Sequence, residues 1–328
     1  MDLKLAKEKG FDFGGATVTD KADILNDAAI LNANASVPAY MRAYADPRVV
    51  EIMTAARNYR KIAPEVKFGD MTTAFAQFRA IEFTGTSTPY GDYDGNGQVG
   101  VNTAYPVREQ YLFQTTLKVG DLEQAMNAEV NLDLYAAKQR SAAIVLDTDF
   151  NRFAFYGVAG KSVYGLLNDP NLNSAISPET VGGSTVWSGK TCDEQMVDIN
   201  KLYKSLVGQA GGYIDDNTPL SMLVSAETMA DLNKRNTYGI SCKQMILDTF
   251  PNIKIIVVPE LHNAITGDTI ILKADEIMGQ NTIEFGYSEK YHAHELVRGL
   301  SDVSQKISAG TYGAIVYLPF AVATMTGV

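Results

Sequence analysis

The alternation of apolar and polar positions is most regular between Val107 and Val119. Because side chains of a strand point to opposite faces in turn, a period of two predicts a β-strand here. A second strand-like run, "TAFAQFRAIEF", ends at Phe83. We therefore predict that residues 66–119 form a long two-stranded hairpin, with Gly85 to Pro106 as a loop that has no further element. One face of its second strand presents Val107, Glu109, Tyr111, Phe113, Thr115, Leu117 and Val119.

The pattern changes to a helical period after Gly120. Leu122, Met126, Val130 and Leu134 recur at every fourth position, so they stack along one face of a helix. The pattern continues to Tyr156, which predicts a helix of about 35 residues, or about 50 Å at the helical rise. We expect this spine helix to bury its apolar face against a sheet of the same chain.

The C-terminal half alternates helical and strand-like segments. A helix with Met196, Ile199, Tyr203 and Leu206 on one face is expected to stop at the glycine-rich run 208–213. A buried strand and a helix, then a helix and a buried strand, follow within residues 219–261. Residues 268–277 read as another strand, and 282–328 as two or more long strands.

The N-terminal region differs from the rest in composition. Residues 1–40 are polar and rich in small residues, which predicts an arm rather than part of a core. A short helix is expected over residues 46–59, capped by Asp46 with Pro47 at its first position.

Composition and charge narrow the function classes. The chain has 328 residues, 46% of them hydrophobic and 20% charged, which supports a sizeable core and argues against disorder. The formal net charge is −10 and the pI is near 4.9. An acidic chain repels phosphate backbones and gains nothing from an anionic membrane surface. We therefore expect no sequence-specific binding of nucleic acid and no membrane association.

Targeting signals and cysteines point to a reducing compartment. The start "MDLKLAKEKG" has no apolar run after its positive charges, unlike a signal peptide. The longest uncharged apolar stretch, "GAIVYLPFAVATMTGV", contains Pro319 and is shorter than the roughly 20 residues of a spanning helix, so it reads as a pair of buried strands. Cys192 and Cys242 are distant in sequence, which suits a reducing cytosol.

A calcium-loop pattern occurs at "DYDGNGQV". Asp92, Asp94 and Asn96 fall at the first, third and fifth places of an EF-hand loop. However, the twelfth place is Thr103, which cannot supply the bidentate carboxylate, and no helix is expected on either side. Because the same residues form ordinary turns, we interpret the stretch as a polar loop tip.

The remaining metal-like pattern is "YHAHE". His292 and His294 are two residues apart, so they share one face of a strand, and Glu295 follows them. A zinc or iron site is geometrically possible, but a surface or interface pair is the alternative reading. No Walker loop, nucleophile elbow or dinucleotide fingerprint occurs. We expect no cofactor, no resident metal and no enzymatic activity.

Three stretches together carry a family resemblance. "FYGVAGKSVYGLLNDPNLNSAI" follows the predicted spine helix, "VWSG…VDINKLY" comes next, and "IIVVPEL" precedes the last strands. In this order, after a polar arm, a hairpin and a long helix, the chain resembles a tailed-phage major capsid protein of the Hong Kong 97 type. The same pattern is similar to encapsulin-like shell proteins.

The resemblance implies an α+β capsid fold with an N-terminal arm, an extended β-hairpin loop, a long spine helix, a peripheral domain and an axial domain. Its expected parts are the arm at 1–40, a short helical segment at 41–65, the extended loop at 66–119, the spine helix with part of the peripheral domain at 120–194, the axial domain at 195–272 and the closing strands at 273–328.

The implied function is that of a virion subunit. Copies of the chain would form pentamers and hexamers of an icosahedral shell, assembled in the host cytoplasm around double-stranded DNA. Scaffolding, portal or decoration proteins would be separate partners. Because an isolated hairpin is marginal in water, neighbouring subunits would cover its apolar residues. The expected interface residues are Tyr90, Tyr93, Tyr111, Phe113 and Leu117.

Three alternatives remain open at the level of sequence. The first is an encapsulin-like cellular compartment, which needs an inner groove for a cargo peptide. The second is a metal-dependent enzyme that uses His292 and His294. The third is a calcium-dependent extracellular binding module. Against it, the chain shows no signal peptide, and the twelfth place of the loop is Thr103 where a carboxylate is needed.

Overall fold

The computed structural model describes residues 57–93, 95–129, 134–263, 265 and 267–328. These residues belong to a unit that runs from Ala55 to Val328, and everything below concerns that unit. The predicted arm and all but the end of the predicted helix at 46–59 lie outside the described residues. The first described helix is the short α3, Tyr59–Ile62.

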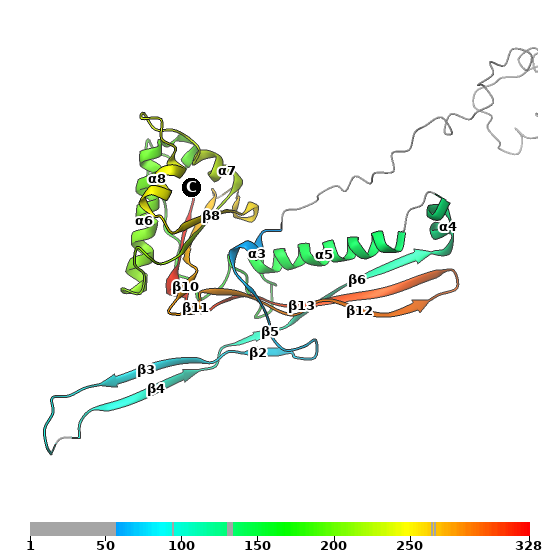
Figure 1. The fold of residues 1–328 in the computed structure, drawn as a ribbon, viewed down its shortest axis with the longest axis horizontal. Helices are drawn as coiled ribbons and strands as arrows, with labels where there is room; N and C mark the ends of the chain where they lie inside the picture. The colour runs from blue at the N-terminus through cyan, green and yellow to red at the C-terminus, as the bar shows by residue number, and fades with distance from the viewer. Residues whose placement is uncertain (1–56, 94, 130–133, 264, 266) are drawn as a thin grey trace, which may run out of the picture. The chain divides into compact units, whose positions relative to one another are not determined.

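One part of the unit is a four-stranded sheet in which three of the strands are long (Figure 1). Its order is β1-β12-β13-β6, with β1 parallel to β12 and the other neighbours antiparallel. The strands are β1 Glu65–Lys67, β12 Ile283–Arg298, β13 Asp302–Val316 and β6 Tyr111–Gly120. The exposure of β6 alternates along its length, so the period of two seen in its sequence is confirmed.

Helix α5, Leu134–Tyr156, packs on this sheet, and the side chains between the helix and the strands form a hydrophobic core. Leu146 and Phe155 on the helix are almost fully buried, at 2% and 0% exposure, and lie in one cluster with Leu117 and Ile307 of the strands. At about 25 cal/mol for each Å² of apolar surface removed from water, such a seam is a main source of stability.

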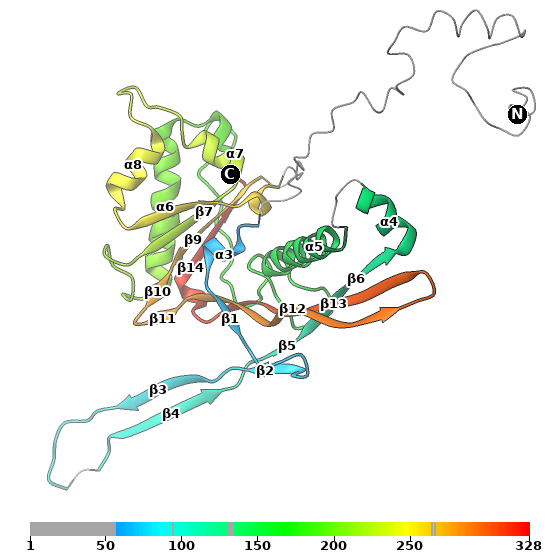
Figure 2. The ribbon, with the colours of Figure 1, turned by 45° about the vertical axis from the view of Figure 1, so that its right-hand side comes forward.

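A second sheet has the order β14-β9-β7-β8 (Figure 2). Its strands are β7 Leu220–Val224, β8 Ile253–Val257, β9 Thr269–Ala274 and β14 Val322–Thr326. Only β7 and β8 run parallel. Alternate residues of β7 enter different clusters: Met222 packs with the helices of this sheet, whereas Leu223 joins the cluster of α5. Both faces of the sheet are therefore buried.

Helix α6, Cys192–Ala210, covers one of these faces together with α8, Cys242–Thr249. Its start is a capping box: the Thr191 hydroxyl accepts from the Glu194 N–H, and the Glu194 carboxylate accepts from the Thr191 N–H. Its end is Gly211, whose φ of 58° is the left-handed conformation that favours glycine.

The remaining elements are short. The helical ones are α4 Asp121–Glu129, α7 Ala226–Asp231, and the 3₁₀ turns η2 Trp187–Gly189, η3 Pro259–Leu261 and η4 Pro319–Ala321. Three two-stranded pairs complete the unit: β2 Phe75–Gln77 with β5 Val107–Glu109, β3 Ala80–Thr86 with β4 Gln98–Ala104, and β10 Glu276–Ile277 with β11 Gln280–Asn281.

The predicted elements of the C-terminal half are confirmed. The helix from Met196, its stop after Ala210, the buried strand at 220–224 and the long strands after residue 282 are all present. The C-terminal apolar stretch forms the end of β13 and the strand β14. Among the described residues, no helix is both long enough and apolar enough to cross a membrane.

The predicted hairpin is only partly correct. Val107 to Val119 is not one strand: the chain leaves β5 at Gln110 and enters β6, which pairs with β13 rather than with the preceding strand. The loop from Gly85 to Pro106 also contains an element, because β4 pairs with β3. Strand β4 was not predicted from the sequence because Gly100 and Asn102 are unfavourable in strands.

The predicted burial of the first part of the spine helix is wrong. The structure describes two helical stretches of this region, α4 and α5, and residues 130–133, and so Val130, lie outside the described part. Leu122 and Met126 in α4 are 70% and 60% exposed, whereas Leu134 in α5 packs on the core. A four-residue spacing reports a helix face but not what covers it, and α4 has few contacts beyond β6 and α5.

A buried ion pair fixes the strands that carry β3 and β4. Arg108 of β5 donates to Asp169 across 2.6 Å, and their side chains are 11% and 0% exposed. The Arg108 guanidinium also lies over the ring of Tyr164, 4.6 Å from its centre. Near this base, Phe68 makes edge-to-face contacts with both Phe78 and Tyr312 of the sheet.

The buried Leu146 of α5 and the exposed Met126 of α4 provide a matched pair of substitutions. Leu146→Ala removes a buried side chain and should lower the free energy of unfolding of the unassembled subunit by about 2–5 kcal/mol. Met126→Ala should change it by less than about 0.5 kcal/mol, because the side chain is in water. Urea unfolding followed by circular dichroism measures both. Equal losses would contradict the separation of α4 from the core.

The buried ion pair of Arg108 and Asp169 should contribute more to stability than an exposed ion pair of the same chain. Asp169→Ala leaves the Arg108 charge buried without a partner, which should cost about 3–5 kcal/mol of unfolding free energy. Lys201→Ala breaks the solvent-exposed pair of Lys201 with Glu179 and should leave the melting temperature almost unchanged. An Asp169→Ala protein as stable as the wild type would show that the pair does not hold the base of the strands.

Candidate subunit interface

The β3–β4 pair, called the ribbon below, has one apolar and one polar face. The register places Phe83 opposite Val101 and Gly85 opposite Val99. With Ile81, these side chains make one face apolar. The other face pairs Glu82 with Asn102, whose side-chain amide donates to the carboxylate across 3.2 Å. The strands are thus amphipathic even though no other element of the described chain lies against them.

Every residue of both strands is exposed. Phe83 is 82% exposed, Val99 93% and Val101 57%. Figures 1 and 2 show the two strands side by side, with no helix or further strand beside them. A lone two-stranded hairpin is marginally stable in water, and contiguous exposed apolar surface marks a site of association. The apolar face therefore has the properties of a surface that is covered by another molecule.

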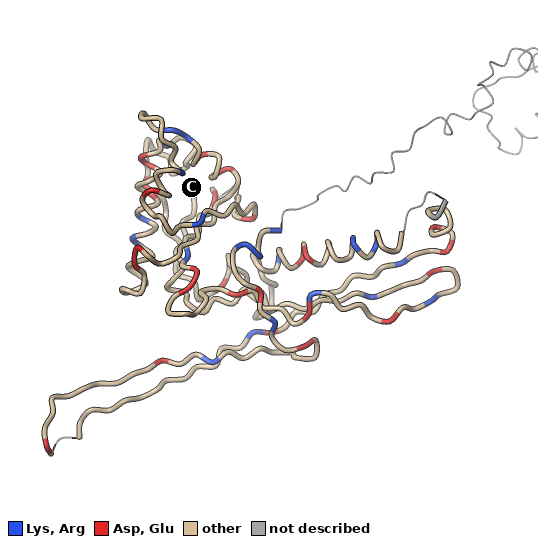
Figure 3. The backbone as a smooth tube through the Cα atoms, viewed as in Figure 1, with Lys and Arg blue, Asp and Glu red and all other residues tan. Residues whose placement is uncertain are grey.

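The charge distribution agrees with this interpretation. Residues 80–106 contain no lysine or arginine and only three acidic residues, so most of the ribbon is tan in Figure 3. Edge strands that stay free in solution commonly carry lysine or other charges that discourage pairing. The ribbon lacks this protection on its apolar face.

The tip of the ribbon contains the calcium-like residues. Asp92 and Asn96 are exposed, and Asp94 lies outside the described residues. The segment follows β3 and leads directly into β4, so strands and not the helices of an EF-hand flank it. Tyr90 and Tyr93 are 92% and 102% exposed, and their role as interface residues stays a prediction.

The other predicted interface residues lie elsewhere. Leu117 is 4% exposed in the core beneath α5, so the expectation that a neighbouring subunit covers it is wrong. Phe113 packs on Phe150 and Phe153 of α5, and Tyr111 packs on Phe153. Because β6 belongs to the four-stranded sheet, its apolar face is already covered within the same chain.

A second exposed apolar area lies at the far end of that sheet. The Asp121 N–H donates to the Ser301 carbonyl across 3.0 Å, so α4 starts beside the turn between β12 and β13. This end of the sheet exposes Leu122, Met126, Leu296, Val297 and Leu300. The sequence pattern identified Leu122 and Met126 as one apolar helix face but assigned that face to a sheet of the same chain, so the exposed area itself was not predicted.

The two strand histidines are brought together as expected. The rings of His292 and His294 lie 4.7 Å apart on β12. His294 Nε2 contacts the Ser308 hydroxyl at 2.8 Å, and His292 Nδ1 lies 3.4 Å from a Glu289 carboxylate oxygen. Among the described residues, the three-residue group that could hold a metal is another one, Glu227 with His262 and Asp268.

Sequence reasoning missed that group for a simple reason. Glu227 is more than 30 positions from His262, and no short motif joins them. His262 and Asp268 end a short connection between η3 and β9, and only the fold places α7 beside it.

The comparisons with known proteins identify the fold. In its structure the chain is similar to the capsid of Myoviridae phage XM1, with a TM-score of 0.73 and 10% identity over 89% of this chain and 99% of that one. It is similar to the capsid of a native GTA particle, with a TM-score of 0.64 and 9% identity over 90% and 99%. A virus-like particle from Pyrococcus furiosus matches with a TM-score of 0.51 and 14% identity over 81% and 90%.

The α+β fold is therefore the Hong Kong 97-type capsid fold. No curated protein sequence matches the chain. The family model of the Pa193 gp26 major capsid protein matches residues 28–327, which is most of the chain. The chain belongs to this family of major capsid proteins and is a structural subunit of a phage capsid.

Proposed function

We propose that copies of this chain assemble into a closed shell through the ribbon, with its apolar face lying on the neighbouring subunit. The observation that carries the proposal is the uncovered face of Phe83, Val99 and Val101. Fully burying one such side chain contributes about 1.5–3 kcal/mol, and the contact recurs at each subunit. A head-to-tail contact of this kind closes into rings, here pentamers and hexamers.

The parts of the chain take corresponding roles in the proposal. The sheet with α5 and the ends of β12 and β13 forms the peripheral domain, and residues 195–272 contribute the axial domain near the centre of each ring. The extended loop at 66–119 is restricted to the ribbon and its base, since β6 belongs to the sheet. The area around Leu122 and Leu300 is a second surface for contacts between subunits.

The contents and partners of the shell follow from charge and chemistry. The acidic chain encloses double-stranded DNA without sequence-specific binding. Each phosphate that a protein neutralises adds affinity, and an acidic chain repels phosphates instead. Assembly takes place in the host cytoplasm, with separate scaffolding, portal or decoration proteins. The subunit is not an enzyme. A phage shell is preferred over a cellular compartment because the matching family is one of major capsid proteins.

Adjacent residues of β3 test the role of the apolar face. Phe83→Asp should give a folded subunit that does not form closed shells, since it places a charge where the neighbour binds. Thr84→Asp is the matched control, because it points to the polar face of the same strand and should assemble normally. Thermal melting reports the fold, and electron microscopy reports shells. Normal yields of shells from Phe83→Asp would refute the proposal.

The tip of the ribbon can be tested separately. Thr86 and Gln98 face each other in the register, so an Asn-Gly pair can replace residues 87–97 and close a two-residue turn. Shortening this loop changes its closure entropy by only about 1–2 kcal/mol, so the subunit should fold. We expect fewer shells, because Tyr90 and Tyr93 are lost. An unchanged yield would remove both tyrosines from the interface.

A further inference from the structure

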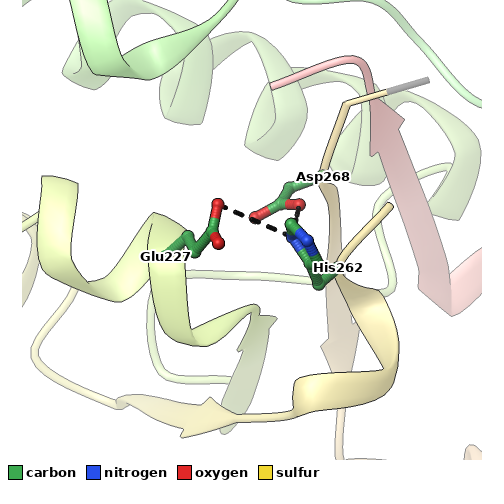
Figure 4. A group of neighbouring side chains, drawn as sticks. All are labelled: Glu227, His262 and Asp268. Carbon is green, nitrogen blue, oxygen red and sulfur yellow. Dashed lines mark hydrogen bonds and ion pairs between the residues drawn. The ribbon is translucent and has the colours of Figure 1, made fainter. Parts of the chain in front are cut away.

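Three ligand-type side chains meet beside the second sheet. Glu227 lies in α7, and His262 and Asp268 lie at the two ends of the connection from η3 to β9 (Figure 4). His262 Nδ1 is 2.8 Å from an Asp268 oxygen and 3.7 Å from a Glu227 oxygen. One donor atom from each residue lies within 4.8 Å of the others. The group therefore offers one imidazole nitrogen and two carboxylate oxygens to a common point.

Asp268 is held in position by other groups. Its Oδ2 accepts hydrogen bonds from the hydroxyls of Ser225 and Thr228, and its Oδ1 accepts from the Asn263 N–H across 3.2 Å. These hydrogen bonds fix the orientation of the carboxylate, as outer partners commonly do for a metal ligand.

The group contains two carboxylates and a single imidazole. Among the residues that the structure describes, neither Glu227 nor Asp268 forms an ion pair with a lysine or arginine. The side chains of Glu227 and His262 are 74% and 42% exposed. Two carboxylates thus share one imidazole at a position that an ion can reach from solvent.

The spacing of the donor atoms fits a small divalent ion. Zinc lies about 2.0–2.2 Å from nitrogen and oxygen ligands, so its tetrahedral ligands are about 3.4 Å apart. The two distances from His262 Nδ1, 2.8 and 3.7 Å, lie on either side of this value. Glu227 can move closer because its side chain is in water. Mixed imidazole and carboxylate ligands suit zinc better than magnesium or calcium.

We propose that Glu227, His262 and Asp268 bind one zinc ion, with water as the fourth ligand. His262 is then neutral with its proton on Nε2, and the ion lies between Nδ1 and the Asp268 oxygen, where a hydrogen bond is otherwise made. The Asp268 carbonyl accepts from the N–H groups of Gly327 and Val328. The ion therefore ties α7 to the 262–268 connection and, through it, to the end of the chain.

The test measures zinc binding to the purified full-length protein after removal of metal by a chelator. The wild type should take up one zinc per subunit, counted by elemental analysis and titrated by calorimetry. Glu227→Gln keeps the size of an exposed side chain, so the fold is retained, and it should weaken zinc binding by at least about tenfold. His262→Gln should weaken it by a similar or larger factor.

A matched control uses the other histidine cluster. His292→Ala removes a histidine that also lies near a carboxylate, and it should leave the zinc affinity and stoichiometry unchanged. Retention of wild-type affinity in both Glu227→Gln and His262→Gln would overturn the proposal, as would the absence of stoichiometric zinc in the wild type. Loss of the zinc on His292→Ala alone would place the ion on β12 and would also overturn it.

Discussion

The apolar face of the ribbon has no cover within the described part of the chain, and this constraint divides the subunit into a core that is complete and a ribbon that is not. Two strands by themselves can satisfy half of their backbone groups and bury almost none of their side chains, so they gain too little to offset the entropy of ordering. The ribbon alone is consequently of marginal stability, and under the proposed function a neighbouring subunit completes it. A subunit built in this way folds its own core but leaves part of its structure to assembly.

The core of the subunit has the buried apolar contacts that the ribbon lacks. Leu146 and Phe155 bind α5 to the four-stranded sheet, and the two faces of the second sheet are buried in separate clusters. The buried pair of Arg108 and Asp169 and the rings around Tyr312 then fix the base from which the ribbon extends. Because all of these contacts lie within one chain, they do not require a neighbouring subunit. One chain can therefore fold its core while the apolar face of its ribbon still has no cover.

The sequence predicted those elements whose pattern is satisfied within the chain. The helix that contains Met196, the buried strand at 220–224 and the long strands after residue 282 follow from the pattern of apolar residues. Strand β4 escaped prediction because Gly100 and Asn102 weaken its local signal. Leu117 and Met126 were assigned to the wrong surroundings, because a periodic apolar face shows that something covers it but not what. The group of Glu227, His262 and Asp268 depends on tertiary contacts, so no local pattern could reveal it.

Hydrogen–deuterium exchange at the ribbon tests the central claim most directly. Amides of β3 and β4, compared between unassembled subunits and closed shells, report whether assembly completes the ribbon, and β13 serves as an internal reference. The account predicts fast exchange around Phe83 and Val101 in the free subunit, strong protection there in the shell, and protection of β13 in both. Equally fast exchange of the ribbon in shells and in free subunits would contradict it.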